Sequence, residues 1–211
     1  MRLWTQGIKP IRSRDLDGLY FPRDDTCPRL LPENGIDGTT VTTSSTFLVG
    51  AVYDVPACGI EARRLWVRSS SGGAGNKLTV QFFQSPDGKR VPRIARRVGT
   101  IYDLEIAAGS TTYSQRFREQ PMILVPGKVF VMWGHSTGAP FSLRCYNAFS
   151  SSEATWSIPT GNGVLNSVFS LSGHDATQVY DSINPLMSGG GTDNASALHF
   201  VLSNNFDDAN N

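Results

Sequence analysis

The chain has 211 residues, of which 39% are hydrophobic and 10% aromatic, so it can bury a core and is not disordered throughout. Its 19 basic and 18 acidic residues leave a net charge of +1, which lacks the basic excess of a typical nucleic-acid-binding domain. Its 21 glycines and 12 prolines favour frequent turns over a helical bundle. We therefore expect one sizeable domain, alone or with appendages.

Residues 1–38 are predicted to form an extended N-terminal arm. Four prolines in this stretch prevent a long helix and disfavour central strands. The stretch also carries Trp4 and the adjacent pair Tyr20 and Phe21, aromatic side chains that a solvated linker seldom has. We expect these three side chains to contact a partner. The sequence has no apolar run long enough for a signal peptide or a membrane span, so we expect no membrane contact.

Residues 39–149 are predicted to form the core of an antiparallel β-sandwich of the jelly-roll kind. Apolar residues alternate with others over 47–53, and two alternating apolar sets interleave over 129–133. Turn signals recur every eight to twelve residues, among them Asp87-Gly88, which is typical of a sandwich or a barrel. The glycine-rich run 71–77 is interpreted as a hairpin loop. Apolar residues do not recur with the 3.6-residue period of an amphipathic helix over any long stretch, so we expect an all-β fold.

Residues 150–211 are predicted to form an irregular, acidic C-terminal segment with short strands. Residues 1–144 hold all 19 basic residues and 12 of the 18 acidic ones, a net charge of +7, whereas residues 145–211 hold the other 6 acids and no base. This asymmetry either has no function or makes the acidic part dock on a basic surface, of its own chain or of a neighbour. Trp156 is a candidate for a surface contact, and 188–191 (Ser-Gly-Gly-Gly) is interpreted as a flexible joint.

One short stretch concentrates positive charge. Within nine residues it has five cations and no acid: Lys89, Arg90, Arg93, Arg96 and Arg97. It is either a solvated loop after the Asp87-Gly88 turn or a contact surface for phosphates or an acidic protein. Because the whole chain is near neutral, we favour an acidic protein surface over nucleic acid, with the acidic part of an adjacent copy as one candidate.

Signals of catalysis and of cofactor binding are weak. The three histidines, His135, His174 and His199, are 39 and 25 residues apart, which is not a metal-ligand spacing, and no nucleophile-elbow motif occurs. The run 71–77 lacks the residues that a phosphate-binding loop needs around its lysine. We therefore expect no cofactor, no metal and no enzymatic activity. A hydrolase is the third-ranked possibility and would need two carboxylates or a histidine at short range in a concave site.

The three cysteines form neither a disulfide framework nor a zinc spacing. Buried free thiols are the preferred interpretation of Cys27, Cys58 and Cys145, in a protein that matures in a reducing compartment. One disulfide, within the chain or between chains, stays open as the alternative.

The run Pro121–Trp133 joins an apolar strand, the turn Pro126-Gly127 and a second apolar strand. With this element, residues 46–149 resemble the jelly-roll modules of tailed-phage virion proteins, such as capsid decoration proteins, head fibres and tail accessory proteins. The N-terminal arm is similar to the clamping arms of such proteins. The resemblance implies a non-enzymatic virion structural protein, oligomeric, assembled in the host cytoplasm and in contact with other virion proteins. It implies no catalytic residues.

Carbohydrate-binding modules share the same strand–turn–strand element. The alternative function is therefore a carbohydrate- or receptor-binding sandwich whose exposed aromatic rings stack on sugars. Trp156 or Tyr113 lining an open groove would favour this alternative.

Overall fold

The computed structural model describes residues 36–43, 45, 47–55, 59–85, 94–147, 158–160, 163–165, 168–185 and 196–204. In chain order the strands of these ranges are β1 (Ile36–Thr42), β2 (Phe47–Val55), β3 (Ile60–Ala62), β4 (Arg64–Arg68), β5 (Lys77–Gln84), β6 (Ala95–Glu105), β7 (Thr112–Arg116), β8 (Met122–Leu124), β9 (Gly127–Thr137), β10 (Ser142–Asn147), β11 (Ile158–Thr160), β12 (Gly163–Leu165), β13 (Val168–Ser172), β14 (Ser182–Ile183), β15 (Ser196–Leu198) and β16 (Phe200–Ser203). The described ranges contain no α-helix, hence none that could cross a membrane. The predicted all-β class is confirmed.

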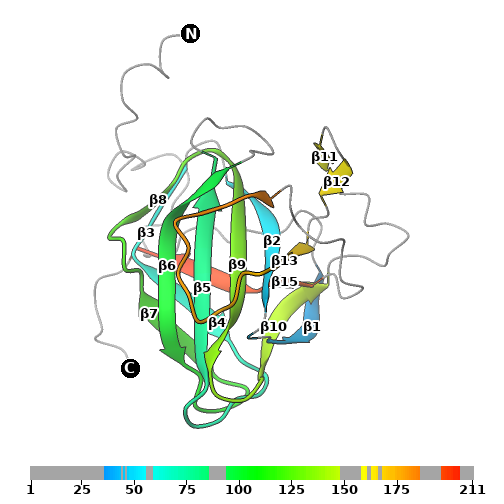
Figure 1. Cartoon of the computed structure of the whole chain (residues 1–211). Coiled ribbons are helices and arrows are strands. Elements are labelled where there is room, and N and C mark those ends of the chain that lie inside the picture. The colour runs from blue at the N-terminus through cyan, green and yellow to red at the C-terminus, as the bar shows by residue number, and fades with distance from the viewer. Residues whose placement is uncertain are drawn as a thin grey trace.

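The first layer of the sandwich is a six-stranded antiparallel sheet. Its strand order is β13-β2-β9-β5-β6-β14, and its long central strands stand side by side in Figure 1. Strand β9 pairs with β2 on one side, from Val49↔Trp133 to Val55↔Gly127, and with β5 on the other. The sheet therefore combines strands that are far apart in the sequence.

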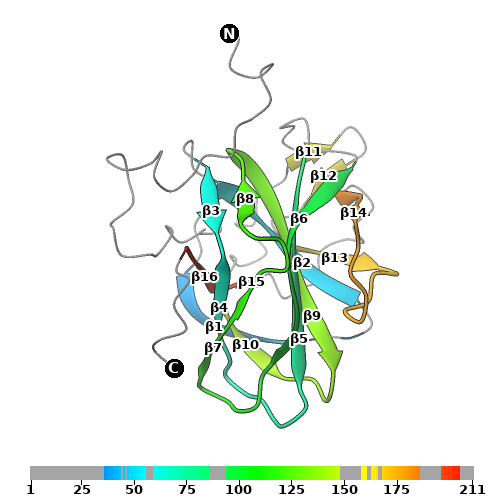
Figure 2. The same ribbon diagram turned by 90° about the vertical axis from the view of Figure 1, so that its left-hand side faces the viewer.

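The second layer contains two three-stranded sheets, β1-β10-β15 and β16-β4-β7. A short pair, β3 with β8, adds to the same side, and Figure 2 shows this layer facing the six-stranded sheet. The two three-stranded sheets meet at an isolated bridge between Ser69 and Leu143. They meet again at the C-terminal strands, because only His199 separates β15 from β16.

The main hydrophobic core fills the space between the two layers. Val129, Val131 and Trp133 of β9 belong to it, whereas Phe130 and Met132 belong to a smaller cluster on the other face of the same sheet. Successive side chains of a strand point to opposite faces, so β9 is buried on both sides. The alternation over 129–133 predicted from the sequence is confirmed, and Trp133 lies in the main core.

The glycine-rich run 71–77 differs from the prediction. Strands β4 and β5 on either side of it lie in different layers, so the run connects the two layers and does not close a hairpin. A Cβ atom on Gly72 would lie 2.7 Å from the carbonyl oxygen of Ile106, which is closer than van der Waals contact allows. The loop crosses so near the end of β6 that glycine is required there.

The C-terminal segment supplies strands to both layers. Strand β13 pairs with β2 and β14 with β6, while β15 pairs with β10 and β16 with β4. Within 168–185 and 196–204 the segment is thus bound to its own sandwich and does not extend as an arm. The reason is its apolar alternation, since Leu198, Phe200 and Leu202 all enter the core. Residues 1–35 lie outside the described ranges, and β1 begins at Ile36, inside the predicted arm.

Candidate functional site

Two of the five cations in the basic stretch lie in described parts of the chain. Arg96 and Arg97 belong to β6, whereas Lys89, Arg90 and Arg93 fall outside the described ranges. Arg96 is exposed, and Ile94, just before the strand, is 56% exposed. Arg97 is partly buried because acidic side chains from two other parts of the chain surround it.

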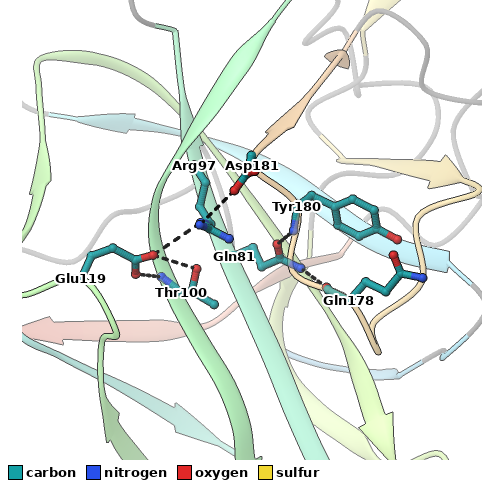
Figure 3. A network of polar contacts seen from close by, with 7 residues as sticks. All are labelled: Gln81, Arg97, Thr100, Glu119, Gln178, Tyr180 and Asp181. Carbon is teal, nitrogen blue, oxygen red and sulfur yellow. Dashed lines mark hydrogen bonds and ion pairs between the residues drawn. The ribbon is translucent and has the colours of Figure 1, made fainter.

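Arg97 binds two carboxylates that are distant in the sequence (Figure 3). Its Nη2 lies 3.1 Å from Asp181 Oδ1, and its Nε lies 3.4 Å from Glu119 Oε1. The backbone N–H of Arg97 also donates to the carbonyl oxygen of Asp181, at 2.9 Å. One acid of the C-terminal part, Asp181, therefore contacts the basic stretch of its own chain.

Glu119 also caps the edge of β6 at a point where no strand of the described ranges lies beside it. Its Oε2 accepts a hydrogen bond from the backbone N–H of Thr100 at 2.7 Å, and the N–H of Arg118 donates to the carbonyl oxygen of Thr100 at 3.0 Å. An edge strand with free backbone groups invites unwanted pairing with other chains. The loop after β7 thus protects this edge.

Residues 173–185, which we call the strap, cross the outer face of the six-stranded sheet, the face turned away from β4 (Figure 1). The buried side-chain amide of Gln81 holds the strap by bonding one backbone C=O and one backbone N–H of it, as the backbone of a neighbouring strand would (Figure 3). Its Nε2 donates to the carbonyl oxygen of Gln178 at 2.9 Å, and its Oε1 accepts from the N–H of Tyr180 at 2.9 Å. The hydroxyl of Tyr102 adds a bond to the carbonyl oxygen of Thr177, at 3.1 Å.

A small apolar cluster lies beneath the strap. Ala176, Ile183 and, partly buried, Tyr180 of the strap pack on side chains from four strands of the sheet: Val52, Phe83, Ala95, Phe130 and Met132. Burial raises the pKa of Tyr180, so its hydroxyl stays protonated, and this oxygen accepts the N–H of Asp175 at 2.9 Å. The strap is held by apolar burial and directional hydrogen bonds together.

The histidines have structural neighbours. His135 is buried, and its Nδ1 lies 3.1 Å from Thr43 Oγ1. Burial lowers the pKa of His135, and hydrogen bonding at Thr43 opposes part of that effect. His174 packs on the ring of Tyr180 with centroids 4.5 Å apart. The described ranges hold no group of three or more His, Cys, Asp or Glu side chains arranged to bind a metal ion.

The cysteine prediction is tested at one position. Cys145 is a free, buried thiol, and burial raises its pKa to about 12. A thiolate is the reactive form of cysteine, so this side chain is inert at neutral pH. Cys27 and Cys58 lie outside the described ranges, and their state stays a prediction.

The structure places some of the aromatic side chains that were considered for contacts with a partner or a sugar. Tyr113 is half-buried, and its hydroxyl bonds the backbone of Ala108. Trp66 donates its Nε1–H to Ser203 Oγ at 3.1 Å. Trp4, Tyr20, Phe21 and Trp156 lie outside the described ranges.

A cleft of about 590 Å³ opens at the end of the sandwich where the layer-connecting loop meets the β9–β10 loop. Tyr113 does not line it, and its one aromatic residue, Phe141, is buried with its ring in the core. The described residues that line the cleft therefore present no exposed aromatic ring on which a sugar could stack.

The sequence singled out Arg97 as a contact for a partner protein, which stays a prediction, and it did not indicate the intramolecular partners Glu119 and Asp181. Gln81 had a usable signal, because it is an amide side chain between the apolar residues Val80 and Phe82 of β5. Such a residue needs a buried hydrogen-bond partner. Here the partner is the backbone of the strap, and a backbone partner cannot be identified from a side-chain motif in the sequence.

No protein-family model matches the chain, and no curated protein is similar enough in sequence to match it.

Proposed function

We propose that the chain is a non-enzymatic structural protein of a virion, a capsid decoration or cement subunit or a tail accessory subunit. It binds neighbouring virion proteins through its surface and its N-terminal residues. The resemblance of 46–149 to jelly-roll modules of tailed-phage virion proteins motivates the assignment. The protein then assembles in the host cytoplasm and functions in the particle.

The architecture supports a role as a rigid scaffold. The layers are closed by the chain's own C-terminal segment, the outer face is covered by the strap, and one free edge of β6 is capped by Glu119. The described faces and the β6 edge of the sheets are largely covered by the chain itself. We therefore expect partners to contact exposed side chains and not the backbone of an open sheet edge.

The observation that carries the proposal is the exposed pair Ile94 and Arg96. Ile94 is the large hydrophobic side chain that the described ranges leave most exposed. The cation of Arg96 lies two residues further on, and it follows Lys89, Arg90 and Arg93 in the sequence. An exposed apolar side chain within a stretch of sequence rich in cations suits a protein surface with acidic residues. We therefore place the contact with a neighbouring virion protein at this pair.

The first test is incorporation into particles purified from the source. The double variant Ile94→Asp with Arg96→Glu should fold and lose incorporation, because it reverses the charge and removes the apolar contact. The control is Thr112→Asp with Arg116→Glu, which changes the charge equally at two exposed residues of β7. Equal incorporation of both variants would refute the contact.

The second test addresses the N-terminal arm. Deleting residues 1–35 keeps β1 whole, so the midpoint temperature of thermal unfolding should not change. Incorporation of the shortened chain into particles should be lost. Particles that take up the shortened chain as well as the full chain would contradict attachment by the arm. Trp4→Ser, Tyr20→Ser and Phe21→Ser together should reproduce the loss.

A further inference from the structure

The C-terminal strands occupy the middle of the second layer. The order is β1, β10, then β15 and β16 in succession, then β4 and β7, because β15 pairs with β10 and β16 pairs with β4. The chain changes neighbour at His199, whose N–H still donates to the carbonyl oxygen of Arg144, at 3.1 Å. Residues 196–203 thus fill a groove between β4 and β10, and we call them the closing strand.

The closing strand contributes as much to the core as any internal strand. Ala197, Leu198, Phe200 and Leu202 are all at most 1% exposed. The ring of Phe200 meets Tyr53 and Phe82 edge to face, with centroids 5.1 and 5.4 Å apart. Without the closing strand, these aromatic rings of the opposite layer would be exposed to water.

Polar contacts fix the register of the closing strand. The buried hydroxyl of Tyr53 donates to the carbonyl oxygen of Leu198 at 2.8 Å. At the other end, the N–H of Arg63 donates to the carbonyl oxygen of Ser203 at 2.8 Å, and Trp66 Nε1 donates to Ser203 Oγ. The groove therefore recognises one sequence in one register, by backbone pairing and alternate side-chain pockets.

The closing strand is synthesised after both strands that line its groove, because β4 and β10 precede residues 196–203 in the sequence. Nearly the whole sandwich precedes the closing strand, and the sequence that leads into it contains Ser188, Gly189, Gly190 and Gly191, a composition typical of a flexible linker. A closing strand from a second copy makes the same contacts as the chain's own, which is the condition for exchange of identical elements. Copies held at high local concentration in an assembly compete for each other's grooves.

We propose that the groove between β4 and β10 accepts the closing strand of a second copy, so that copies in an assembly are joined by exchanged C-terminal strands. The inference rests on the proposed function, because it supposes that copies meet in an assembly. Reciprocal exchange gives a closed pair, and one-way exchange gives a chain of copies. Each exchanged strand brings four core side chains into the neighbour, so the link breaks only when these side chains leave the neighbour's core.

A disulfide trap in the full chain tests the exchange. Val201 and Trp66 are paired in register across β16 and β4, and both are half-buried. One copy carries Trp66→Cys and an affinity tag, and the other carries Val201→Cys. Both are co-expressed in a background with Cys27→Ser and Cys58→Ser. Cys145 is retained, because its buried thiol does not react.

The exchange predicts a disulfide-linked pair of one tagged and one untagged chain, seen at twice the mass of the single chain in denaturing mass spectrometry. The control pairs Val201→Cys with Thr112→Cys, an exposed residue of β7 that β4 separates from β16. It should give no such product. A single chain with both Trp66→Cys and Val201→Cys should form the bond within itself when expressed alone and dilute, which confirms that the substitutions keep the register.

The exchange is refuted if the doubly substituted chain forms its internal disulfide while the co-expressed pair yields no more linked product than the control. Particle incorporation of the unsubstituted chain is measured in parallel. If the chain is incorporated into particles but no linked pairs form, the strand-exchange proposal is refuted and the proposed function stands. If linked pairs form but the chain is not incorporated, the strand exchange is supported and the proposed function is refuted.

Discussion

The two faces of the six-stranded sheet are both buried, but by different means. On the inner face Leu78, Val80 and Phe82 of β5 enter the main core, where burial is almost entirely apolar. On the outer face the alternate residues are Thr79, Gln81 and Phe83, and Gln81 bonds the backbone of the strap. Apolar burial is non-directional and scales with area, whereas the outer face depends on a few bonds of fixed geometry.

This difference has a consequence for local stability. The closing strand is tied to the second layer along both of its neighbours and carries four core side chains. The strap is tied to the sheet by β14, which has two residues, and by side chains. Segments with few buried apolar contacts open at lower free energy than the global unfolding of the protein. The C-terminal segment thus contains one part as stable as the core and one part that opens more easily.

The largest expected effect is at the inner face. Phe82→Ala should lower the free energy of unfolding by about 3–5 kcal/mol, because it leaves a cavity among large buried side chains. The rings of Phe117 and Phe200 each lie 5.4 Å from that of Phe82 and would lose their contact. Chemical denaturation measures the loss. Phe82→Leu, which keeps most of the volume, should cost clearly less, and an equal cost would argue against tight packing at this position.

A smaller effect is expected on the outer face. Gln81→Ala should cost about 1–3 kcal/mol, since it leaves the carbonyl oxygen of Gln178 and the N–H of Tyr180 without their partner. Hydrogen exchange should accelerate over 176–183 and stay unchanged in β9. The matched control is Gln115→Ala, which removes a single bond to the carbonyl oxygen of Tyr102. Unchanged exchange in the strap of the Gln81 variant would contradict its role.

The pH dependence should carry a contribution from His135. Burial lowers the pKa of His135 in the folded protein below its unfolded value of about 6.5. Below that value the unfolded chain binds a proton that the folded chain does not, so stability falls as the pH drops from neutral towards the folded pKa. His135→Gln should weaken this fall between pH 7 and pH 5. The same fall in both proteins, measured by denaturation at each pH, would show that His135 does not contribute.

The smallest effect is expected at the exposed ion pair. The side chain of Asp181 is 95% exposed, and pairs of this kind contribute about 0–1 kcal/mol. Asp181→Asn should therefore change stability little, because the backbone bond from Arg97 to residue 181 is kept. Thermal unfolding at low and at high salt measures the change. A loss as large as that of Gln81→Ala would mean that charge, and not the amide bonds, holds the strap.

The fold class could be predicted because alternation is a local property of the sequence. The interleaved apolar sets over 129–133 indicated a strand, and the structure places them on opposite faces of β9, with Trp133 on one face and Phe130 on the other. The buried thiol expected at Cys145 also lies in the core. Short strands of the C-terminal segment were also expected, but not their partners.

The pairing of strands could not be predicted, because it is set by contacts between distant residues. The apolar run 198–202 is too short to show which strands accept it. The strap is even less visible, since Gln81 bonds its backbone and backbone has no sequence signature. The charge asymmetry pointed to docking of the acidic part, but only the fold selects Arg97 as the site.

Hydrogen exchange of the full chain, followed by mass spectrometry, tests the central claim most directly. If the C-terminal segment is part of the sandwich, the amides of β15 and β16 should exchange as slowly as those of β9, and the strap should exchange earlier. Exchange of β15 and β16 as fast as an unstructured peptide would show that these residues do not close the second layer.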